Sequence, residues 1–282
     1  MNVKIITDSA SDILQEDGRR LGIEILPLKT IFLNEEYLDG VTISHEEFYR
    51  KLIETNEIPK TSQISPFEYE ECYKRNKDHD LVVITLSKKL SGCYQSAMIA
   101  KEEYSNVYVV DSESVAIGEQ ILVKYAIRLA ALGESAKAIA EKLNIAKKNI
   151  KVVALLDTLE YLKKGGRISA TQAIVGTILS IKPVVGVKDG KIVMLGKARG
   201  SKNGNNMLRR FVKDSGGIDF KMPFVTAYTG LSDAMLKKYL DDSKDLYSLD
   251  QKDIPISTIG STIGTHVGPG AIALAFFKKL EA

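Results

Sequence analysis

The sequence has little of what secreted, membrane-spanning or fibrous proteins depend on. Its 282 residues include two cysteines, Cys72 and Cys93, without pairing or metal-ligand spacing, which excludes a disulfide scaffold and is typical of a reducing cytoplasm. Seven prolines beside 21 glycines exclude a collagenous or low-complexity chain. No apolar run approaches the roughly 20 residues that cross a bilayer. We therefore expect a cytoplasmic protein, with no leader before a first strand at residues 3–7.

Four motifs of nucleotide-binding and hydrolytic enzymes are also missing. The chain has no GxxxxGK[ST] phosphate loop, no GxGxxG after a strand, no HExxH helix and no GxSxG elbow. Ser91 and His266 remain as a nucleophile and a base, with Asp8 or Asp111 as the orienting acid. Because Ser91 lacks the elbow, a serine-dependent acyl hydrolase is kept only as an alternative.

Acidic charge is scarce in the second half of the chain. Residues 1–150 carry 19 Lys and Arg against 24 Asp and Glu, whereas residues 151–282 carry 20 against 12. Between residues 163 and 213, twelve basic residues accompany one acid, Asp189. Such an excess favours an anionic partner, namely nucleic acid, an anionic membrane surface or an acidic protein. A solvated basic surface explains it equally well.

The first half alternates apolar β-branched runs with amphipathic stretches. This alternation predicts a mostly parallel, doubly wound α/β sheet. The expected strands are residues 3–7, 81–86, 107–110 and 152–156, and the expected helices are residues 66–74, 91–104, 118–132 and 136–147.

The second half has a different texture. Asp189-Gly190 predicts a hairpin between strands at residues 184–187 and 191–195, and residues 170–181 form an apolar stretch. Further strands are expected at residues 224–228 and 256–259, and helices at residues 205–213, 233–240 and 270–280. We expect an N-terminal α/β domain at residues 1–159 and a second, smaller α+β domain at residues 160–282, with a ligand between them.

Hydroxyl-rich and glycine-rich turns are the candidate binding segments. Ser91-Gly92 opens a predicted helix, where free backbone N–H groups and the Ser91 hydroxyl can receive an oxyanion; alternatively, Ser91 only caps that helix. Ser65 and Pro66 are expected at the start of another helix. Thr61 and Ser62 are then free donors, or part of an ordinary polar loop.

Histidine 266 stands in a glycine-rich frame, residues 259–271. The glycines permit close backbone approach, and a histidine there can donate to a carboxylate or a phosphate. A lone histidine is more often structural, so the glycine frame is what singles His266 out.

Six segments carry a resemblance that spans nearly the whole chain. They are DSASD at residues 8–12, TSQISP at 61–66, LSGCYQ at 90–95, GRIS at 166–169, IKP at 181–183 and GPGA at 268–271. In this order they resemble the DegV family of bacterial fatty-acid-binding proteins, which includes the FakB-type substrate-binding subunits of fatty acid kinase. The sequence departs from the family pattern at Cys93, where threonine is usual, and at Ile64, where proline is usual.

The resemblance implies a non-catalytic lipid-binding protein with two α/β domains around a buried long-chain fatty acid, palmitate- or oleate-like. It places Thr61, Ser62, Ser91 and Gly92 at the carboxylate, with His266 close by. It implies no metal and no cofactor. The bound acid is presented to a separate ATP-dependent fatty acid kinase catalytic subunit, and the acyl phosphate passes to phospholipid synthesis. A lipid-sensing regulatory protein is an alternative with the same pocket.

Two further groups of residues follow from this interpretation. Ile174, Ile178 and Ile181 are expected to line the acyl-chain pocket, although residues 170–181 also read as a plain core helix. Arg167, Arg199 and Lys202 are expected to dock the kinase or a transient anionic membrane surface. Nucleic acid ranks last as a partner, because no interleaved aromatics accompany the charge.

Overall fold

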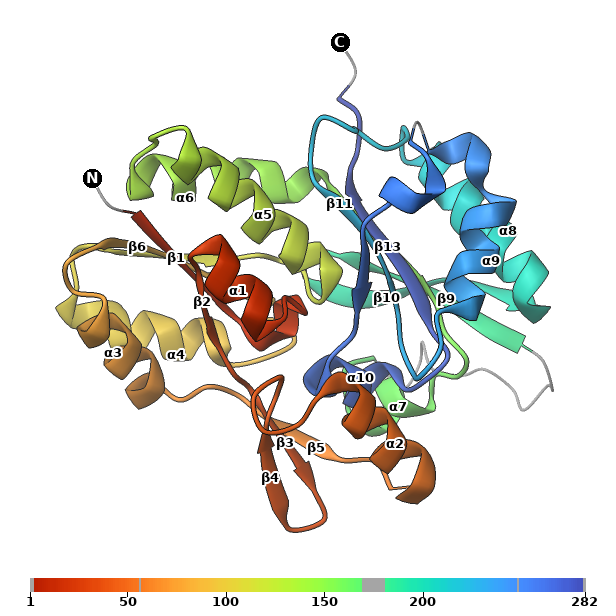
Figure 1. Ribbon diagram of the computed structural model, residues 1–282, viewed down its shortest axis with the longest axis horizontal. Helices are drawn as coiled ribbons and strands as arrows, with labels where there is room; N and C mark the ends of the chain where they lie inside the picture. The colour runs from red at the N-terminus through yellow and green to blue at the C-terminus, as the bar shows by residue number, and fades with distance from the viewer. Residues whose placement is uncertain (1–2, 56, 169–180, 248, 281–282) are drawn as a thin grey trace.

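The computed structural model describes residues 3–55, 57–168, 181–247 and 249–280. Two larger sheets lie side by side, and a smaller third sheet projects below them in Figure 1. No described helix has both the length and the apolarity needed to cross a membrane.

The first sheet is parallel throughout, with the order β2-β1-β6-β7. Helices α3 and α4 cover one face and α5 and α6 the other (Figure 1), so the predicted doubly wound architecture is confirmed. The strands are β1 Val3–Asp8, β2 Glu24–Leu26, β6 Asp80–Thr85 and β7 Val107–Asp111. The helices are η1 Ser9–Ser11, α1 Gln15–Leu21, α3 Pro66–Arg75, α4 Cys93–Ala100, α5 Ile117–Ala131 and α6 Ala136–Ala146.

The second sheet is mostly antiparallel, with the order β10-β9-β8-β13-β11-β12. Only the β11–β12 pair is parallel among the described strands of this sheet. Helix α8 packs on β8, β9 and β10, and α9 packs on β11. The strands are β8 Ile150–Leu155, β9 Ile181–Lys188, β10 Lys191–Arg199, β11 Phe224–Tyr228, β12 Ile256–Thr258 and β13 Ile272–Phe277; the helices are α8 Gly200–Asp214 and α9 Ala234–Asp242.

The third sheet is formed by three short strands within residues 29–62. Its order is β4-β3-β5, and it packs beside three helices at the base of the molecule (Figure 1). The strands are β3 Lys29–Phe32, β4 Glu35–Leu38 and β5 Lys60–Ser62, and the helices are α2 His45–Thr55, α7 Glu160–Lys164 and α10 Ser261–Val267.

The start of helix α3 is determined by the local sequence, which leaves the residues before it available for other contacts. The Ser65 hydroxyl accepts the N–H of Glu68 at 3.3 Å, and the Glu68 carboxylate accepts the N–H of Ser65 at 2.7 Å. With Pro66 at the first helical position, this is a complete capping box. Because Ser65 serves the helix, Thr61 and Ser62 are not needed to cap it.

Two predicted elements differ from the structure. The strand expected at residues 152–156 exists as β8, but it pairs antiparallel with β13 and β9 in the second sheet instead of extending the parallel one. The helix expected at residues 270–280 is wrong, because these residues contain β13, which lies between β8 and β11. Alanine and leucine favour a helix in isolation, whereas a strand buried on both faces also appears as a continuous apolar run. The division at residues 159 and 160 stays a prediction.

Candidate functional site

A cavity of about 260 Å³ opens between the two larger sheets, above the third. Its lining comes from both halves of the chain: β5, the turn before α4, the loop before α5, α7, β10 and α10 all contribute. The lining residues are Leu28, Thr61, Ser62, Gln63, Leu86, Leu90, Ser91, Gly92, Val115, Leu162, Arg167, Ile192, Thr262, Ile263, His266 and Val267. All five residues that the family resemblance placed at or near a carboxylate lie in this lining. We refer to it as the polar cavity.

Strand β5 and helix α10 bring Thr61 and His266 together across 205 positions of sequence. Thr61 pairs with Thr30 of β3, which fixes its strand in the third sheet. Its hydroxyl lies 2.9 Å from Nε2 of His266. Nδ1 of His266 is buried and has no hydrogen-bond partner within the described structure.

The environment of His266 keeps its imidazole neutral at pH 7. Burial, and secondly the positive charge of Arg167, lower the pKa of His266 from 6.5 to about 4. A close glycine also confines the ring, because a Cβ atom on Gly165 would lie 2.2 Å from Nδ1 of His266. The neutral ring therefore lies at the cavity as a hydrogen-bonding group that an anionic ligand would convert toward its charged form.

The serine–glycine turn serves both the helix and the cavity. The N-cap residue of α4 is Gly92 and not Ser91, but the Ser91 hydroxyl accepts the N–H of Cys93 at 3.3 Å while Ser91 also lines the polar cavity. Gly92 directly precedes α4, and the side chain of Gln63 packs against it. A Cβ atom at Gly92 would lie 2.0 Å from Oε1 of Gln63. The thiol of Cys93 is buried, and burial raises its pKa to about 12, so it stays protonated beside Ser91.

Arg167 lies in the cavity lining, a position that sequence patterns did not reveal. Its Nη1 donates to the carbonyl of Gly165 at 2.7 Å, and its Nε donates to the carbonyl of Leu90 at 3.2 Å. The contact with Leu90 links the segment after α7 to the turn before α4. The two contacts hold a cation at the polar cavity, where it can attract a carboxylate.

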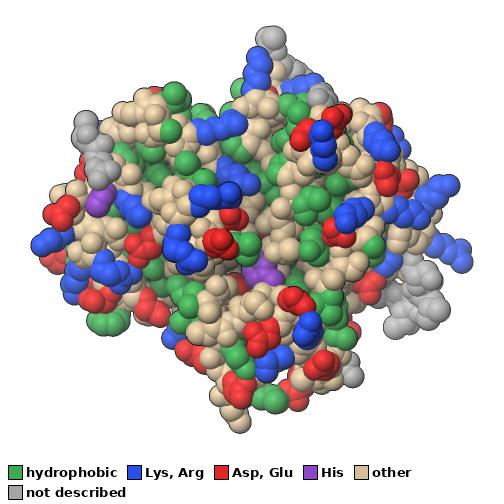
Figure 2. All heavy atoms as spheres, viewed as in Figure 1, with side chains coloured by type: hydrophobic (Ala, Val, Ile, Leu, Met, Phe, Trp, Pro, Cys, Tyr) green, Lys and Arg blue, Asp and Glu red, His purple; other side chains and the backbone are tan. Residues whose placement is uncertain are grey.

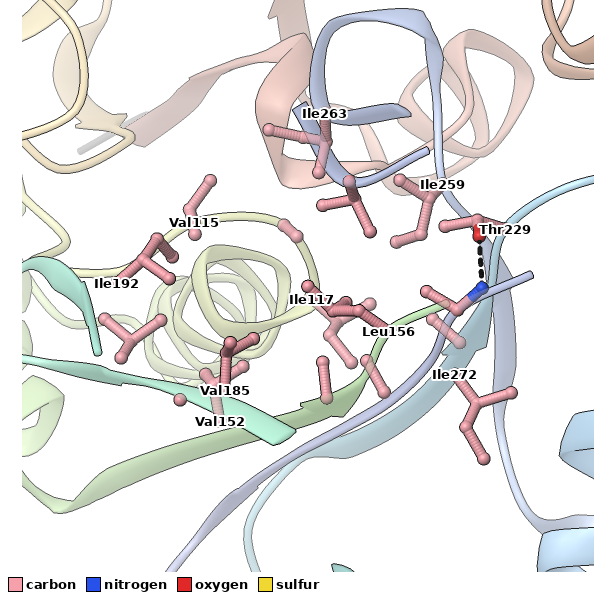
Figure 3. Close-up of a pocket in the computed structure, with 18 of the residues that line it drawn as sticks. Val115, Ile117, Val152, Leu156, Val185, Ile192, Thr229, Ile259, Ile263 and Ile272 are labelled. Carbon is pink, nitrogen blue, oxygen red and sulfur yellow. Dashed lines mark hydrogen bonds between the residues drawn. The ribbon is translucent and has the colours of Figure 1, made fainter. Parts of the chain in front are cut away.

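A second, apolar cavity of about 70 Å³ adjoins the polar one. The two share five lining residues: Val115, Leu162, Ile192, Ile263 and Val267. Figure 3 shows branched aliphatic side chains from several elements pointing into this space, with Ile117 and Val185 among them. Thr229 belongs to the lining, but its hydroxyl already accepts the N–H of Ala271 at 2.7 Å.

Three alanines that lie directly opposite one another on adjacent strands form one wall of the apolar cavity, which we call its bed. Ala273 of β13 pairs with Ala154 of β8 on one side and with Ala227 of β11 on the other. All three line the apolar cavity and none lines the polar one. Small side chains on three adjacent strands leave this space open between the sheet and α5.

The remaining predicted residues lie elsewhere. Ile174 and Ile178 fall outside the described residues, and Ile181 begins β9 without appearing in the lining of either cavity. Arg199 ends β10 and Lys202 lies in the first turn of α8, where both are exposed. The acyl-wall and docking assignments stay predictions.

The residues of the alternative hydrolase do not form a triad in the described structure. His266 contacts Thr61, while Asp8 accepts the backbone N–H groups of Leu86 and Ala10. Asp111 accepts the N–H of Glu113 at 2.9 Å. Nor do the described His, Cys, Asp and Glu side chains form a group that could hold a metal ion.

Comparison with known proteins identifies the family of this chain. The family model described as an uncharacterised protein of the DegV family matches residues 2–279. The chain therefore belongs to the DegV family. It is 35% identical to a DegV domain-containing protein of Caldanaerobacter subterraneus over 98% of this chain and 99% of that protein.

Solved structures of relatives agree with this fold. A DegV family protein from Thermus thermophilus, described as fatty acid binding, has a TM-score of 0.88 and 29% identity, covering 99% of this chain and 100% of that one. A DegV lipid-binding protein from Thermotoga maritima has a TM-score of 0.86 and 28% identity, covering 98% of each chain. DegV family proteins thus include fatty-acid-binding proteins.

The low pKa of His266 makes stability depend on pH in a defined window. Between about pH 6.5 and 4, the unfolded chain takes up a proton at this site that the folded protein does not. The unliganded protein should therefore lose up to about 3 kcal/mol of stability over this window relative to His266→Gln. Urea unfolding of both proteins across the window measures the difference, and parallel pH profiles would contradict the neutral-histidine assignment.

Proposed function

We propose that this protein binds one long-chain fatty acid, palmitate- or oleate-like, with its carboxylate in the polar cavity and its tail in the apolar one. The observation that carries the proposal is the adjoining of the two cavities through five shared aliphatic residues. A ligand with one anionic end and a long apolar body fits such a division. The fatty acid and lipid binding described for the Thermus and Thermotoga relatives supports the same ligand class.

The polar cavity supplies donors for a desolvated carboxylate. Removing a carboxylate from water is costly unless hydrogen bonds replace its hydration. Hydroxyls of Thr61, Ser62 and Ser91 line the polar cavity together with the Arg167 guanidinium. The tail adds about 0.8 kcal/mol for each buried CH₂, so most of the affinity comes from the apolar cavity. In this proposal the protein needs no cofactor.

Removing the proposed carboxylate donors should weaken binding without abolishing it. Thr61→Val and Ser91→Ala each delete one hydroxyl, and we expect each to lower fatty acid affinity about tenfold, the effect of a hydrogen bond to a charged group. Native mass spectrometry of freshly purified protein, followed by solvent extraction, measures the bound acid. Titration with a fluorescent fatty acid gives the affinities.

The same variants separate a carrier from the alternative hydrolase. A carrier with Ser91→Ala still binds a stoichiometric acid, whereas a hydrolase loses all turnover of acyl esters. A wild-type protein that carries no lipid, takes up no fatty acid and hydrolyses acyl esters would overturn the proposal. Ser105→Ala is a control for the loss of a hydroxyl, because Ser105 lies just before β7 of the first sheet and lines neither cavity.

The three alanines of the apolar cavity should set the length of the tail. Ala273→Leu adds three carbon atoms to the bed, and because protein interiors are close-packed, we expect the preferred acid to shorten by about three carbons. Competition among acids of graded length measures the preference. Ala138→Leu on α6 is the control, since Ala138 lines neither cavity. An unchanged length profile in Ala273→Leu would place the tail elsewhere.

We further propose that the bound acid is presented to a separate ATP-dependent fatty acid kinase for acyl-phosphate formation. The basic segment at residues 163–213 supports this partner or an anionic membrane surface, although several of its charges are already paired. Lys182 pairs with Asp157, and Arg209 and Lys213 pair with Asp245. Figure 2 shows Lys and Arg side chains gathered at the edge formed by α8 and α9. Arg199 and Lys202 lie exposed at the start of α8.

Charge reversal at the start of α8 should weaken docking and spare the pocket. For Arg199→Glu with Lys202→Glu, we expect slower acyl-phosphate formation with a fatty acid kinase, or slower exchange with anionic vesicles, while the bound lipid is retained. Lys77→Glu with Lys137→Glu controls for the change of net charge, because Lys77 follows α3 and Lys137 lies on α6, away from α8. Loss of bound lipid in the α8 variant would show that these residues belong to the pocket instead.

A further inference from the structure

Helix α10 carries much of the polar cavity but is poorly suited to form by itself. It has seven residues, of which four are β-branched: Thr262, Ile263, Thr265 and Val267. Such residues lower helix propensity, and helices this short are unstable in isolation. The residue before it, Gly260, has no side chain with which to cap it. Something outside the helix must therefore hold it in place.

Asp39, from the turn after β4, supplies the missing cap. Its Oδ1 accepts both the N–H and the hydroxyl of Ser261 at 2.8 Å, and its Oδ2 accepts the N–H of Thr262 at 3.3 Å. The same Oδ2 accepts the hydroxyl of Ser9 at 3.1 Å, which ties the turn to η1. Asp39 is 1% exposed, so these contacts are shielded from water.

Asp12, which follows η1, completes the arrangement. Its Oδ1 accepts the N–H of Gly260 at 2.7 Å. Three successive N–H groups at the start of α10, which a helix leaves unpaired, are therefore accepted by the side chains of Asp39 and Asp12. Burial raises the pKa of Asp12 well above its usual range. The fit is close: a Cβ atom on Gly260 would lie 2.8 Å from Oδ1 of Asp39 and 2.8 Å from Nε2 of His45.

The far end of the same helix meets the proposed ligand. His266 contacts Thr61 at 2.9 Å, and Ile263 and Val267 line both cavities. We propose that Asp39, assisted by Asp12, is a positioning residue that holds α10 so that His266 and Ile263 face the fatty acid. This inference rests on the proposed function for its ligand, but the contacts that carry it concern the protein alone.

Asp39→Asn tests the inference, because it keeps the shape and removes the charge. An amide that replaces the carboxylate brings an N–H group toward the N–H groups of α10. We expect fatty acid affinity to fall about tenfold or more. We also expect the imidazole NMR signal of His266 to move and its pKa to rise toward 6.5, since a displaced α10 exposes the ring. Only three histidines are present, and His266→Gln assigns the signal.

Glu119→Gln is the control for replacing a buried carboxyl group with an amide of the same shape, and burial raises the pKa of Glu119 well above its usual range. Glu119 is 0% exposed and accepts the hydroxyl of Thr7 at 3.1 Å. Thr7 lies in β1, so this hydrogen bond does not involve α10. We expect it to change stability while leaving the His266 signal in place. An unchanged His266 signal and unchanged affinity in Asp39→Asn would overturn the inference.

Ser261→Ala keeps the test decisive if Asp39→Asn does not fold. It removes the hydroxyl that Asp39 accepts at 2.8 Å, which also lies 2.8 Å from the hydroxyl of Thr30, and it leaves the Asp39 carboxylate in place. We expect a smaller shift of the His266 signal in the same direction, and no shift would count against the inference. If wild-type protein fails to bind fatty acid, the proposed function fails, while the NMR comparison still decides the role of Asp39.

Discussion

Burial of α5 between the two larger sheets is the constraint on which the rest of the structure depends. The helix contacts β1 and β6 of the first sheet and β8, β11 and β13 of the second. Nine of its residues are buried, including Glu119 and Gln120, and the two exposed ones, Arg128 and Ala131, lie in its last turn, as expected for a helix packed on most of its surface. Gln120 donates to the carbonyl of Asp12 at 3.0 Å and to the hydroxyl of Ser257 at 3.2 Å. Because one helix packs on both sheets, the space beside its start, at Val115 and Ile117, becomes an interior cavity.

The polar cavity is assembled from segments that only the tertiary fold brings together. Thr61 comes from the third sheet, Ser91 from the turn before α4, and His266 from a helix near the end of the chain. Different contacts fix the three segments. Thr61 is held by strand pairing, Ser91 by the N–H of Cys93 that its hydroxyl accepts, and the helix of His266 by the side chains of Asp39 and Asp12. A change in any of these contacts displaces one donor without removing it, so distant residues can tune the site.

Sequence patterns predicted the parallel sheet, the helix start at Ser65 and Pro66 and the hairpin at Asp189-Gly190, because local propensity and tertiary structure agree there. The positive φ angles of Asp189 and Gly190 are those that a tight hairpin turn requires. The patterns misread β13, whose neighbours on both sides are strands from elsewhere in the chain. They assigned Arg167 to a docking surface, and they passed over Asp39. The roles of these two residues depend on contacts with distant backbone groups, which periodicity does not encode.

The separation of a polar cavity from an apolar one affects how a bound acid would be transferred to a partner. In the proposed complex, the carboxylate is held by hydroxyls and by a guanidinium already engaged with two carbonyls, Gly165 and Leu90. Such donors replace the hydration of the carboxylate, although the guanidinium is shared with two carbonyls and does not form a bidentate ion pair with the carboxylate alone. The tail meanwhile provides affinity that does not depend on the state of the carboxyl group. Conversion of that group to another anionic derivative would therefore leave most of the binding energy intact, which suits a protein that presents its ligand for chemistry carried out elsewhere.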